Sequence, residues 1–216
     1  MANLTNGGFR VWGTVTGGEG AFPTTFINEL ASGYNTAIGI GDIVIPVSDG
    51  TLARAAASDN GKLLGVVTAC SYVAGGITVG RSLSNYIPAS TTFSPTAVGS
   101  SNASLVQWVP LTSEVILEVD GSAAFSTPTA AGVIGLIGEN VDLVVGTADA
   151  TTGVSAFYVD LSTHNTTTFN FRIVGIRNYT LQQGFSTLDN DPTASHFKFL
   201  VVCNEGFWPS YTATGI

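Results

Sequence analysis

The amino-acid sequence predicts an all-β fold, either a single β-barrel or a jelly-roll-like sandwich, with extended segments at both ends. Short apolar runs rich in Val, Ile, Thr and Phe recur about eight to ten times, and turn signals separate them every ~8–14 residues. No amphipathic helical run is longer than about ten residues. A chain of 216 residues can bury a sufficient core without disulfides, and no repeat of ~20–50 residues divides it.

Residues 1–30 are expected to form an extended N-terminal arm. The glycine pairs Gly7-Gly8 and Gly17-Gly18 disfavour both helix and strand interiors. Four large aromatic side chains nevertheless occur along this segment, namely Phe9, Trp12, Phe22 and Phe26. Such side chains need a surface that buries them. Two alternatives are open: the arm packs on its own domain, or it reaches a neighbouring subunit.

Residues 31–206 are expected to form the β domain, and its first strands flank a clear turn. The runs "AIGIGDIVIPV" and "TLARAA" lie on either side of Ser48-Asp49-Gly50. Pro46 cannot donate a hydrogen bond to a neighbouring strand, so the first run is expected at a sheet edge or at a bulge. A longer strand, "KLLGVVTACSYV", follows.

The second half of the domain continues the strand pattern through "SLVQWVPL", "EVILEVDG", "NVDLVV", "SAFYVDLS", "TFNFRIVGI" and "HFKFLVVCNEG". In "EVILEVDG", Val115, Leu117 and Val119 alternate with other residues that include Glu118 and Asp120. This period of two predicts a half-exposed strand. The remaining residues, 207–216, are expected to form a C-terminal tail with the aromatic residues Phe207, Trp208 and Tyr211.

The charge content is the most informative feature of the composition. The chain has 7 Lys and Arg against 15 Asp and Glu, a net charge of −8, and charged residues make up 10% of it. An ordinary soluble domain has roughly 25%. No basic stripe is present, which excludes the usual nucleic-acid binder. The surface is therefore expected to be covered by small polar residues or by a partner.

The compartment is predicted from three further features of the chain. No run of about 18 apolar residues occurs, so no membrane-spanning helix is expected. The first residues, "MANLTNGGFR", lack the basic and apolar regions of a secretory signal, which predicts synthesis and use from the cytoplasm. Cys70 and Cys203 each lie in an apolar strand-like run and are expected to be buried free thiols. A disulfide between them stays open as an alternative.

The sequence contains only poor candidates for a catalytic nucleophile or for metal ligands. His164 and His196 lie among polar residues at strand edges and are expected in turns or on the surface. Together with the two cysteines they show no zinc-ligand spacing. Ser155 in "GVSAF" lacks the second glycine and the helix of a nucleophile elbow.

The carboxylates also point to surface roles. Glu114 and Glu118 lie four residues apart on one predicted strand face and are expected to be solvated, not to flank a glycosidase cleft. Asp189 and Asp191 in "LDNDPT" favour a turn before proline over a calcium loop. The sequence therefore predicts no enzyme, no cofactor and no metal.

Several short motifs resemble one protein family as a set. They are Gly33-Tyr34, Gly41-Asp42, the turn Asp49-Gly50-Thr51, the strand start Leu64-Gly65-Val66, and Cys70. The segments "ADATTGVSAFYVDLS", "FRIVGI" and "FLVVCNEG" extend the similarity to roughly residues 30–206. With these features the chain resembles the capsid decoration (cement) and head proteins of tailed bacteriophages. The N-terminal arm and the C-terminal tail lie outside the resemblance.

The resemblance implies a structural virion protein on the outside of the phage head, assembled in the bacterial cytoplasm. The implied partners are the major capsid protein and neighbouring copies of the chain, as a dimer or a trimer, with no nucleic acid and no membrane. Aromatic residues dominate interface hot spots. The expected interface residues are therefore Phe9, Trp12, Phe22, Phe26, Phe207, Trp208 and Tyr211. The alternative is a tail or fibre protein with a glycan-binding β-sandwich, for which Trp108 and Tyr86 are the candidate sites.

Overall fold

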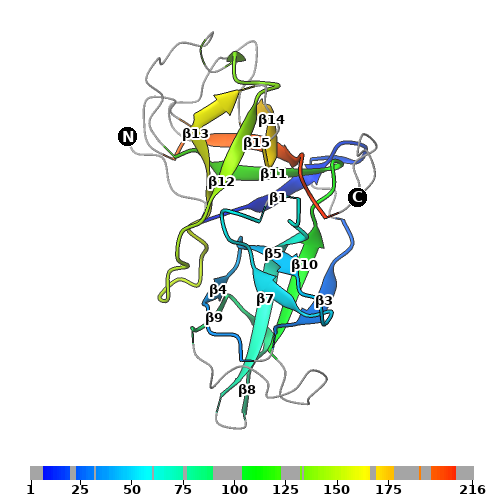
Figure 1. The fold of residues 1–216 in the computed structure, drawn as a ribbon, viewed down its shortest axis with the longest axis vertical. Helices are drawn as coiled ribbons and strands as arrows, with labels where there is room; N and C mark the ends of the chain where they lie inside the picture. The colour runs from blue at the N-terminus through cyan, green and yellow to red at the C-terminus, as the bar shows by residue number, and fades with distance from the viewer. Residues whose placement is uncertain are drawn as a thin grey trace.

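The fold is all-β and sandwich-like, which confirms the predicted class. The computed structural model describes residues 7–19, 23–31, 33–59, 61–74, 77–89, 104–122, 132, 134–165, 169–177, 190 and 196–207. Within these residues the strands form antiparallel sheets of seven, six and two strands, and no sheet closes into a barrel. In Figure 1 the seven-stranded sheet lies above the six-stranded one.

The seven-stranded sheet joins the two ends of the described chain. Its strand order is β13-β12-β14-β15-β11-β1-β2. The bounds are β1 (Arg10–Thr14), β2 (Gly18–Glu19), β11 (Val115–Asp120), β12 (Asn140–Val144), β13 (Tyr158–Asn165), β14 (Phe171–Ile176) and β15 (Lys198–Cys203). Because β1 lies next to β11, the first strand of the chain pairs with one more than a hundred residues later, as only a folded domain allows.

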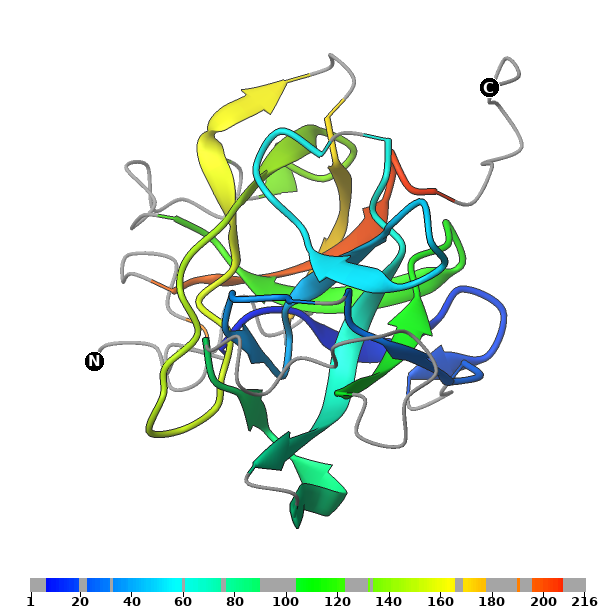
Figure 2. The ribbon, with the colours of Figure 1, turned by 60° about the horizontal axis from the view of Figure 1, so that its bottom comes forward.

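The six-stranded sheet has the order β3-β10-β7-β5-β6, and β8 pairs with β7. The bounds are β3 (Phe26–Glu29), β5 (Ile43–Pro46), β6 (Leu52–Arg54), β7 (Gly65–Ala74), β8 (Ile77–Ser84) and β10 (Leu105–Pro110). The short sheet consists of β4 (Ile38–Gly39) and β9 (Tyr86–Ile87). The far end of the β7–β8 hairpin projects from the body at the bottom of Figures 1 and 2.

Strand β5 lies inside the sheet, so the expectation that Pro46 marks an edge strand or a bulge is wrong. β5 pairs with β7 only through Ile43 and Val44, whereas Pro46 pairs with Leu52 of β6 at the end of the strand. On the β7 side, the ladder has ended before it reaches the proline. The missing N–H of Pro46 therefore costs no hydrogen bond between β5 and β7.

The main core lies between the two large sheets, and a second core lies behind the six-stranded sheet. Alternate residues of a strand point to opposite faces. Accordingly Ile43 and Val66 are buried in the main core, whereas Val44 and Val67 are buried in the second. The main core also takes the inward residues of β11 and the phenylalanines of the seven-stranded sheet. The six-stranded sheet is thus apolar on both faces.

The described part of residues 1–30 is not an extended arm, which corrects the prediction. β1 pairs with β11 and with β2, and β3 pairs with β10, so this segment contributes two strands to the seven-stranded sheet and one to the six-stranded sheet. The glycine pair has a packing role. Gly8 has a φ of 86°, and a Cβ on it would lie 2.4 Å from the Cβ of Ser155. Glycine therefore lets the backbone pass close to Ser155 and deliver Phe9 into the core.

The structure also corrects the prediction that the second face of β11 is exposed. Val115, Leu117 and Val119 are buried, as the alternation predicts, but Glu118 and Asp120 are buried too. The Arg177 Nε lies 3.2 Å from a Glu118 carboxylate oxygen, and His196 Nδ1 lies 3.6 Å from one of Asp120. The second face of β11 is therefore a covered polar layer. Glu114, just before the strand, is exposed as expected.

Candidate interaction surface

The residues considered for chemistry serve local structure. His164 Nδ1 lies 2.7 Å from a Glu139 carboxylate oxygen, and both side chains are partly exposed. The hydroxyl of Ser155 accepts a hydrogen bond from the Phe157 N–H at 3.0 Å. Asp189 and Asp191 lie outside the described residues. Among the residues that are described, no three His, Cys, Asp or Glu side chains group as metal ligands would.

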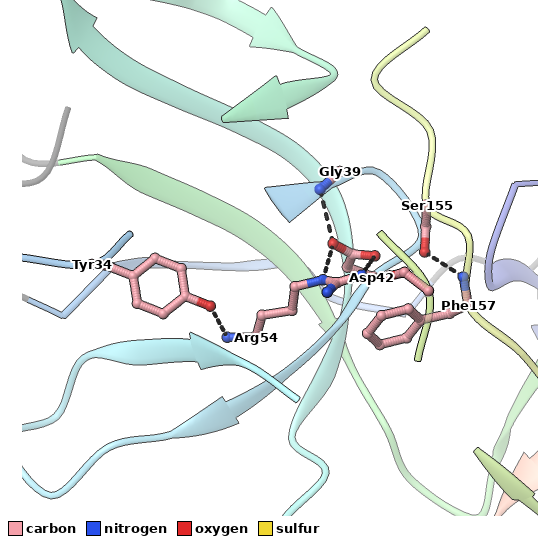
Figure 3. Close-up of polar contacts among 7 residues, drawn as sticks. Tyr34, Gly39, Asp42, Arg54, Ser155 and Phe157 are labelled. Carbon is pink, nitrogen blue, oxygen red and sulfur yellow. Dashed lines mark hydrogen bonds and ion pairs between the residues drawn. The ribbon is translucent and has the colours of Figure 1, made fainter. Parts of the chain in front are cut away.

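A buried ion pair with several further contacts lies between the two large sheets. Arg54, at the end of β6, donates from Nε to Asp42 Oδ2 at 2.7 Å and from Nη2 to Oδ1 at 3.3 Å. The guanidinium also donates to the carbonyl of Gly146 and lies 4.3 Å from the ring centroid of Phe157. Figure 3 shows Arg54 between Asp42 and the Phe157 ring. The pair therefore ties the β5–β6 hairpin to the segment that connects β12 with β13.

Further hydrogen bonds complete this junction, which we define as Tyr34, Asp42, Arg54, Ser155 and Phe157. The backbone N–H of Gly39 donates to Asp42 at 2.9 Å, and the N–H of Arg54 donates to the hydroxyl of Tyr34 at 2.8 Å. Ser155 also hydrogen-bonds to Asp42.

Burial raises the pKa of the Asp42 carboxyl, and the hydrogen bond from Arg54 opposes that rise. The junction satisfies its charges internally and serves the fold.

The predicted interface aromatics fall into four groups. Phe9 is in the main core, 4.7 Å from the ring of Phe171, so it packs on its own domain and the interface prediction for it is wrong. Trp12 is half-buried, with the Arg177 guanidinium 5.9 Å from its ring centroid. Phe26 and Phe207 are exposed. The last group, Phe22, Trp208 and Tyr211, lies outside the described residues.

Strand β3 places two large apolar side chains in an exposed position at a sheet edge. This strand is the last in the order of its sheet, and Phe26 and Ile27 are 43% and 62% exposed. The strand is nevertheless firmly held. The ring of Phe26 stacks 5.1 Å from that of Trp108, whose Nε1 donates to Asn28 at 3.0 Å. We call Phe26 and Ile27 with their strand the β3 edge.

A cleft of about 440 Å³ lies beside the β3 edge, where the two large sheets meet. Arg10 and Val11 of β1 form one wall, and Val67, Gln107 and Val109 contribute to the other side. Pro23 and Thr25, directly before β3, also line it. Among the described residues that line the cleft, Arg10 alone is charged, and the others are apolar or neutral polar groups. Glu29, at the end of β3, is the one charged residue of that strand.

The glycan-binding alternative loses its main candidate residue. Trp108 is only 4% exposed, because one of its faces is covered by Phe26 and its edge packs on Gly65. A buried indole cannot stack on a sugar ring. Tyr86 is half-buried in the short β4–β9 sheet.

Sequence reasoning missed Ile27 and the junction. A signal for Ile27 was present, because adjacent Phe26 and Ile27 must point to opposite faces of a strand. The ion pair had no such signal, since Arg54 also contacts Gly146, which is 92 residues away.

Cys70 and Cys203 are free and buried, which confirms the expected free thiols. They lie in different cores, Cys70 in the second and Cys203 in the main one. Burial raises the pKa of each thiol to about 12. Both thiols therefore stay protonated and unreactive at neutral pH.

Comparison of the chain with protein-family models, with curated proteins and with solved structures gave no match. The resemblance to phage head proteins therefore stays a prediction from the sequence motifs. In the described part of the chain, no helix is long and apolar enough to span a membrane.

Proposed function

We propose that the chain is a structural virion protein that decorates the outside of a tailed-phage head and stabilises contacts between neighbouring major capsid protein subunits. The observation that carries this proposal is an apolar edge strand exposed on a chain with only 10% charged residues. Exposed edge strands are normally protected by charges or by proline, because they pair readily with other chains. The two exposed positions of the β3 edge have no such protection.

The mechanism follows from burial of this surface. A neighbouring shell subunit covers Phe26 and Ile27 and fills part of the adjacent cleft, which removes apolar area from water at about 25 cal/mol per Å² before ordering costs. The firm attachment of β3 to β10 keeps those ordering costs small, because the strand is already in place. Hundreds of copies on one shell make individually weak contacts effective.

The role also fits the rest of the molecule. The junction holds the two sheets together with satisfied buried charges, as a rigid building block requires. A net charge of −8 disfavours contact with packaged DNA. Contacts between copies of the chain, as a dimer or a trimer, belong to the same proposal.

The test is the number of copies of this chain in purified particles, measured by quantitative mass spectrometry against the major capsid protein. The proposal predicts hundreds of copies, at parity with the capsid protein or at a simple fraction of it. A count of about 3 to 18 would place the chain in the tail or at a vertex. Absence from particles would contradict a structural virion role altogether.

A further inference from the structure

Strand β3 presents backbone hydrogen-bonding groups at its open side as well as apolar side chains. In Figure 1 it forms the right-hand border of the six-stranded sheet, with β10 on its inner side. The N–H of Leu30 donates to the carbonyl of Ser104 at 3.0 Å, and Asn28 lies opposite Val106 in the same register. Along an antiparallel strand, residues that bond to the facing strand alternate with residues whose backbone groups point away from it.

This alternation fixes the direction of the Ile27 backbone. Because Leu30 bonds toward β10, Asn28 does so as well, and the N–H and C=O of Ile27 point to the open side. The residue opposite Ile27 agrees with this, since the carbonyl of Gln107 accepts the hydroxyl of Thr68 on β7 at 3.3 Å and so faces away from β3. Ile27 therefore offers one donor and one acceptor outward, at a position where its side chain is also 62% exposed.

The open stretch is short and is held in place by its own domain. At its start, Gln107 Nε2 donates a hydrogen bond to the Thr25 hydroxyl at 3.0 Å. At its other end, Leu30 forms a bridge with Leu52 of β6, so the stretch that can take another strand is limited to Phe26–Glu29. An edge that is already in position binds an extended segment at a low ordering cost.

The side chains around the edge define what an added strand must carry. Ile27 shares its sheet face with Gln107, because cross-strand partners point to the same face, and Gln107 also lines the cleft. A strand added beside Ile27 directs alternate side chains to this face, where apolar ones remove Ile27 from water. Glu29 is the one charged residue of β3, and the chain has a net charge of −8, so a segment without carboxylates is favoured.

We propose that the shell subunit contacts the β3 edge by strand addition. An extended, neutral or basic segment of that subunit, with apolar residues at alternate positions, pairs with Phe26–Glu29 and exchanges backbone hydrogen bonds with Ile27. This inference rests on the proposed function and names the mode of its contact. The backbone bonds supply affinity, and the alternate side chains beside Ile27 supply specificity. The six-stranded sheet thereby gains a strand that belongs to the capsid.

The first test is hydrogen–deuterium exchange of the full-length chain, free and bound to purified particles that lack this protein, read at single residues by mass spectrometry. The N–H of Ile27 should exchange rapidly in the free chain and at least about tenfold more slowly on the particles. The N–H of Asn28, which bonds toward β10, is the internal reference and should exchange slowly in both states. An Ile27 amide that exchanges equally fast in both states would overturn strand addition.

A proline variant with a matched control tests the same backbone bond in a second way. Ile27→Pro removes an N–H that β10 does not use, whereas Ile27→Ala keeps the N–H and shortens the side chain. We expect at least about tenfold fewer bound copies for Ile27→Pro than for Ile27→Ala, because an added strand loses a hydrogen bond and meets the proline ring. Equal binding of the two folded variants would overturn the proposal.

A third form of the chain keeps the test decisive if Ile27→Pro does not fold. The α-hydroxy acid analogue of isoleucine at position 27 replaces the N–H by an ester oxygen and keeps the side chain, so it should lower the number of bound copies at least about threefold relative to wild type. An unchanged number would overturn strand addition.

The outcomes also separate this inference from the function on which it rests. Particles that bind the chain while the Ile27 amide stays unprotected contradict strand addition alone. Particles that bind no wild-type chain contradict both the proposed function and this inference.

Discussion

The junction and the β3 edge both reverse the usual placement of side chains: the junction buries charged groups, and the β3 edge exposes apolar ones. The junction buries a carboxylate and a guanidinium between two sheets, where Asp42 is fully buried and the Arg54 side chain is only 8% exposed. The β3 edge leaves a phenylalanine and an isoleucine in water on the last strand of a sheet. A protein that uses one of its few cations inside while it exposes apolar side chains outside has a surface suited to contact with another protein.

The same contrast separates the sequence motifs that stabilise the fold from the residues that offer a contact surface. Tyr34 and Asp42, which belong to the motifs on which the predicted resemblance rests, both bind Arg54. These two motif residues therefore stabilise the fold of this chain, and they are not direct evidence for the proposed partner. Evidence for contact comes instead from residues outside the motifs, in the segment 23–30. The experiments below measure how far stability and contact are separable in this way.

Removal of residues 1–28 should have the largest effect. The deletion takes away β1, most of β3 and the core residue Phe9, so we expect loss of more than the whole free energy of unfolding, typically about 5–15 kcal/mol. The truncated chain should show no cooperative thermal transition by circular dichroism. A cooperative transition within a few degrees of the full chain would restore the idea of a separable arm.

Replacement of the buried cation, Arg54, should have the second-largest effect on stability. Arg54→Met leaves Asp42 buried without its partner and should lower the free energy of unfolding by about 3–5 kcal/mol at pH 7. The measurement is urea unfolding. As a control, the double variant Asp42→Leu, Arg54→Met should recover part of the loss, because no buried charge is left unpaired.

The same variant has a defined pH dependence. Burial already raises the pKa of Asp42, and loss of Arg54 raises it further because the opposing hydrogen bond is gone. A group with a raised pKa in the folded state destabilises the fold as pH rises through that pKa. The deficit of Arg54→Met relative to wild type should therefore shrink as the pH falls from 7 toward 4. A constant deficit would show that the charge is not its cause.

Replacement of two phenylalanines, one at a time, compares the core directly with the β3 edge. Phe9→Ala should cost about 3–5 kcal/mol of unfolding free energy, since it opens a cavity against Phe171. Phe26→Ala should cost about 1 kcal/mol or less, because the side chain is 43% exposed. Chemical denaturation of both variants under one condition gives the comparison. Equal losses would mean that the β3 edge is part of the core.

The smallest expected effect is the reaction of the two cysteine thiols with a thiol reagent in the native protein. Because burial raises the pKa of Cys70 and Cys203 to about 12, neither should react with a thiol reagent at pH 8 in the folded state. Both should react after unfolding in denaturant. Rapid reaction of either thiol in the native protein would show that its core opens locally.

Local patterns predicted the strands well, and long-range contacts explain what they missed. The alternation in "EVILEVDG" predicted the inward residues of β11, because one strand contains that information. It did not show that Glu118 and Asp120 are covered, since the groups beside them come from residues 177 and 196. The pair Gly7-Gly8 likewise favoured an extended arm, because the sequence does not show which distant residues it contacts. Only contact with Ser155 reveals that Gly8 is needed for close packing.

The most direct test of the central claim is shell occupancy of an Ile27→Asp variant. Ile27 is 62% exposed on β3, so the change should leave the unfolding free energy within about 0.5 kcal/mol of wild type. The control is Val174→Asp on β14, which charges another exposed apolar residue in the other sheet. Both variants would be added to particles that lack this protein, and bound copies counted by mass spectrometry. We predict at least a tenfold loss of bound copies for Ile27→Asp, equivalent to about 1.4 kcal/mol, and none for the control. Wild-type occupancy by a folded Ile27→Asp variant would contradict the claim that the β3 edge is the contact surface.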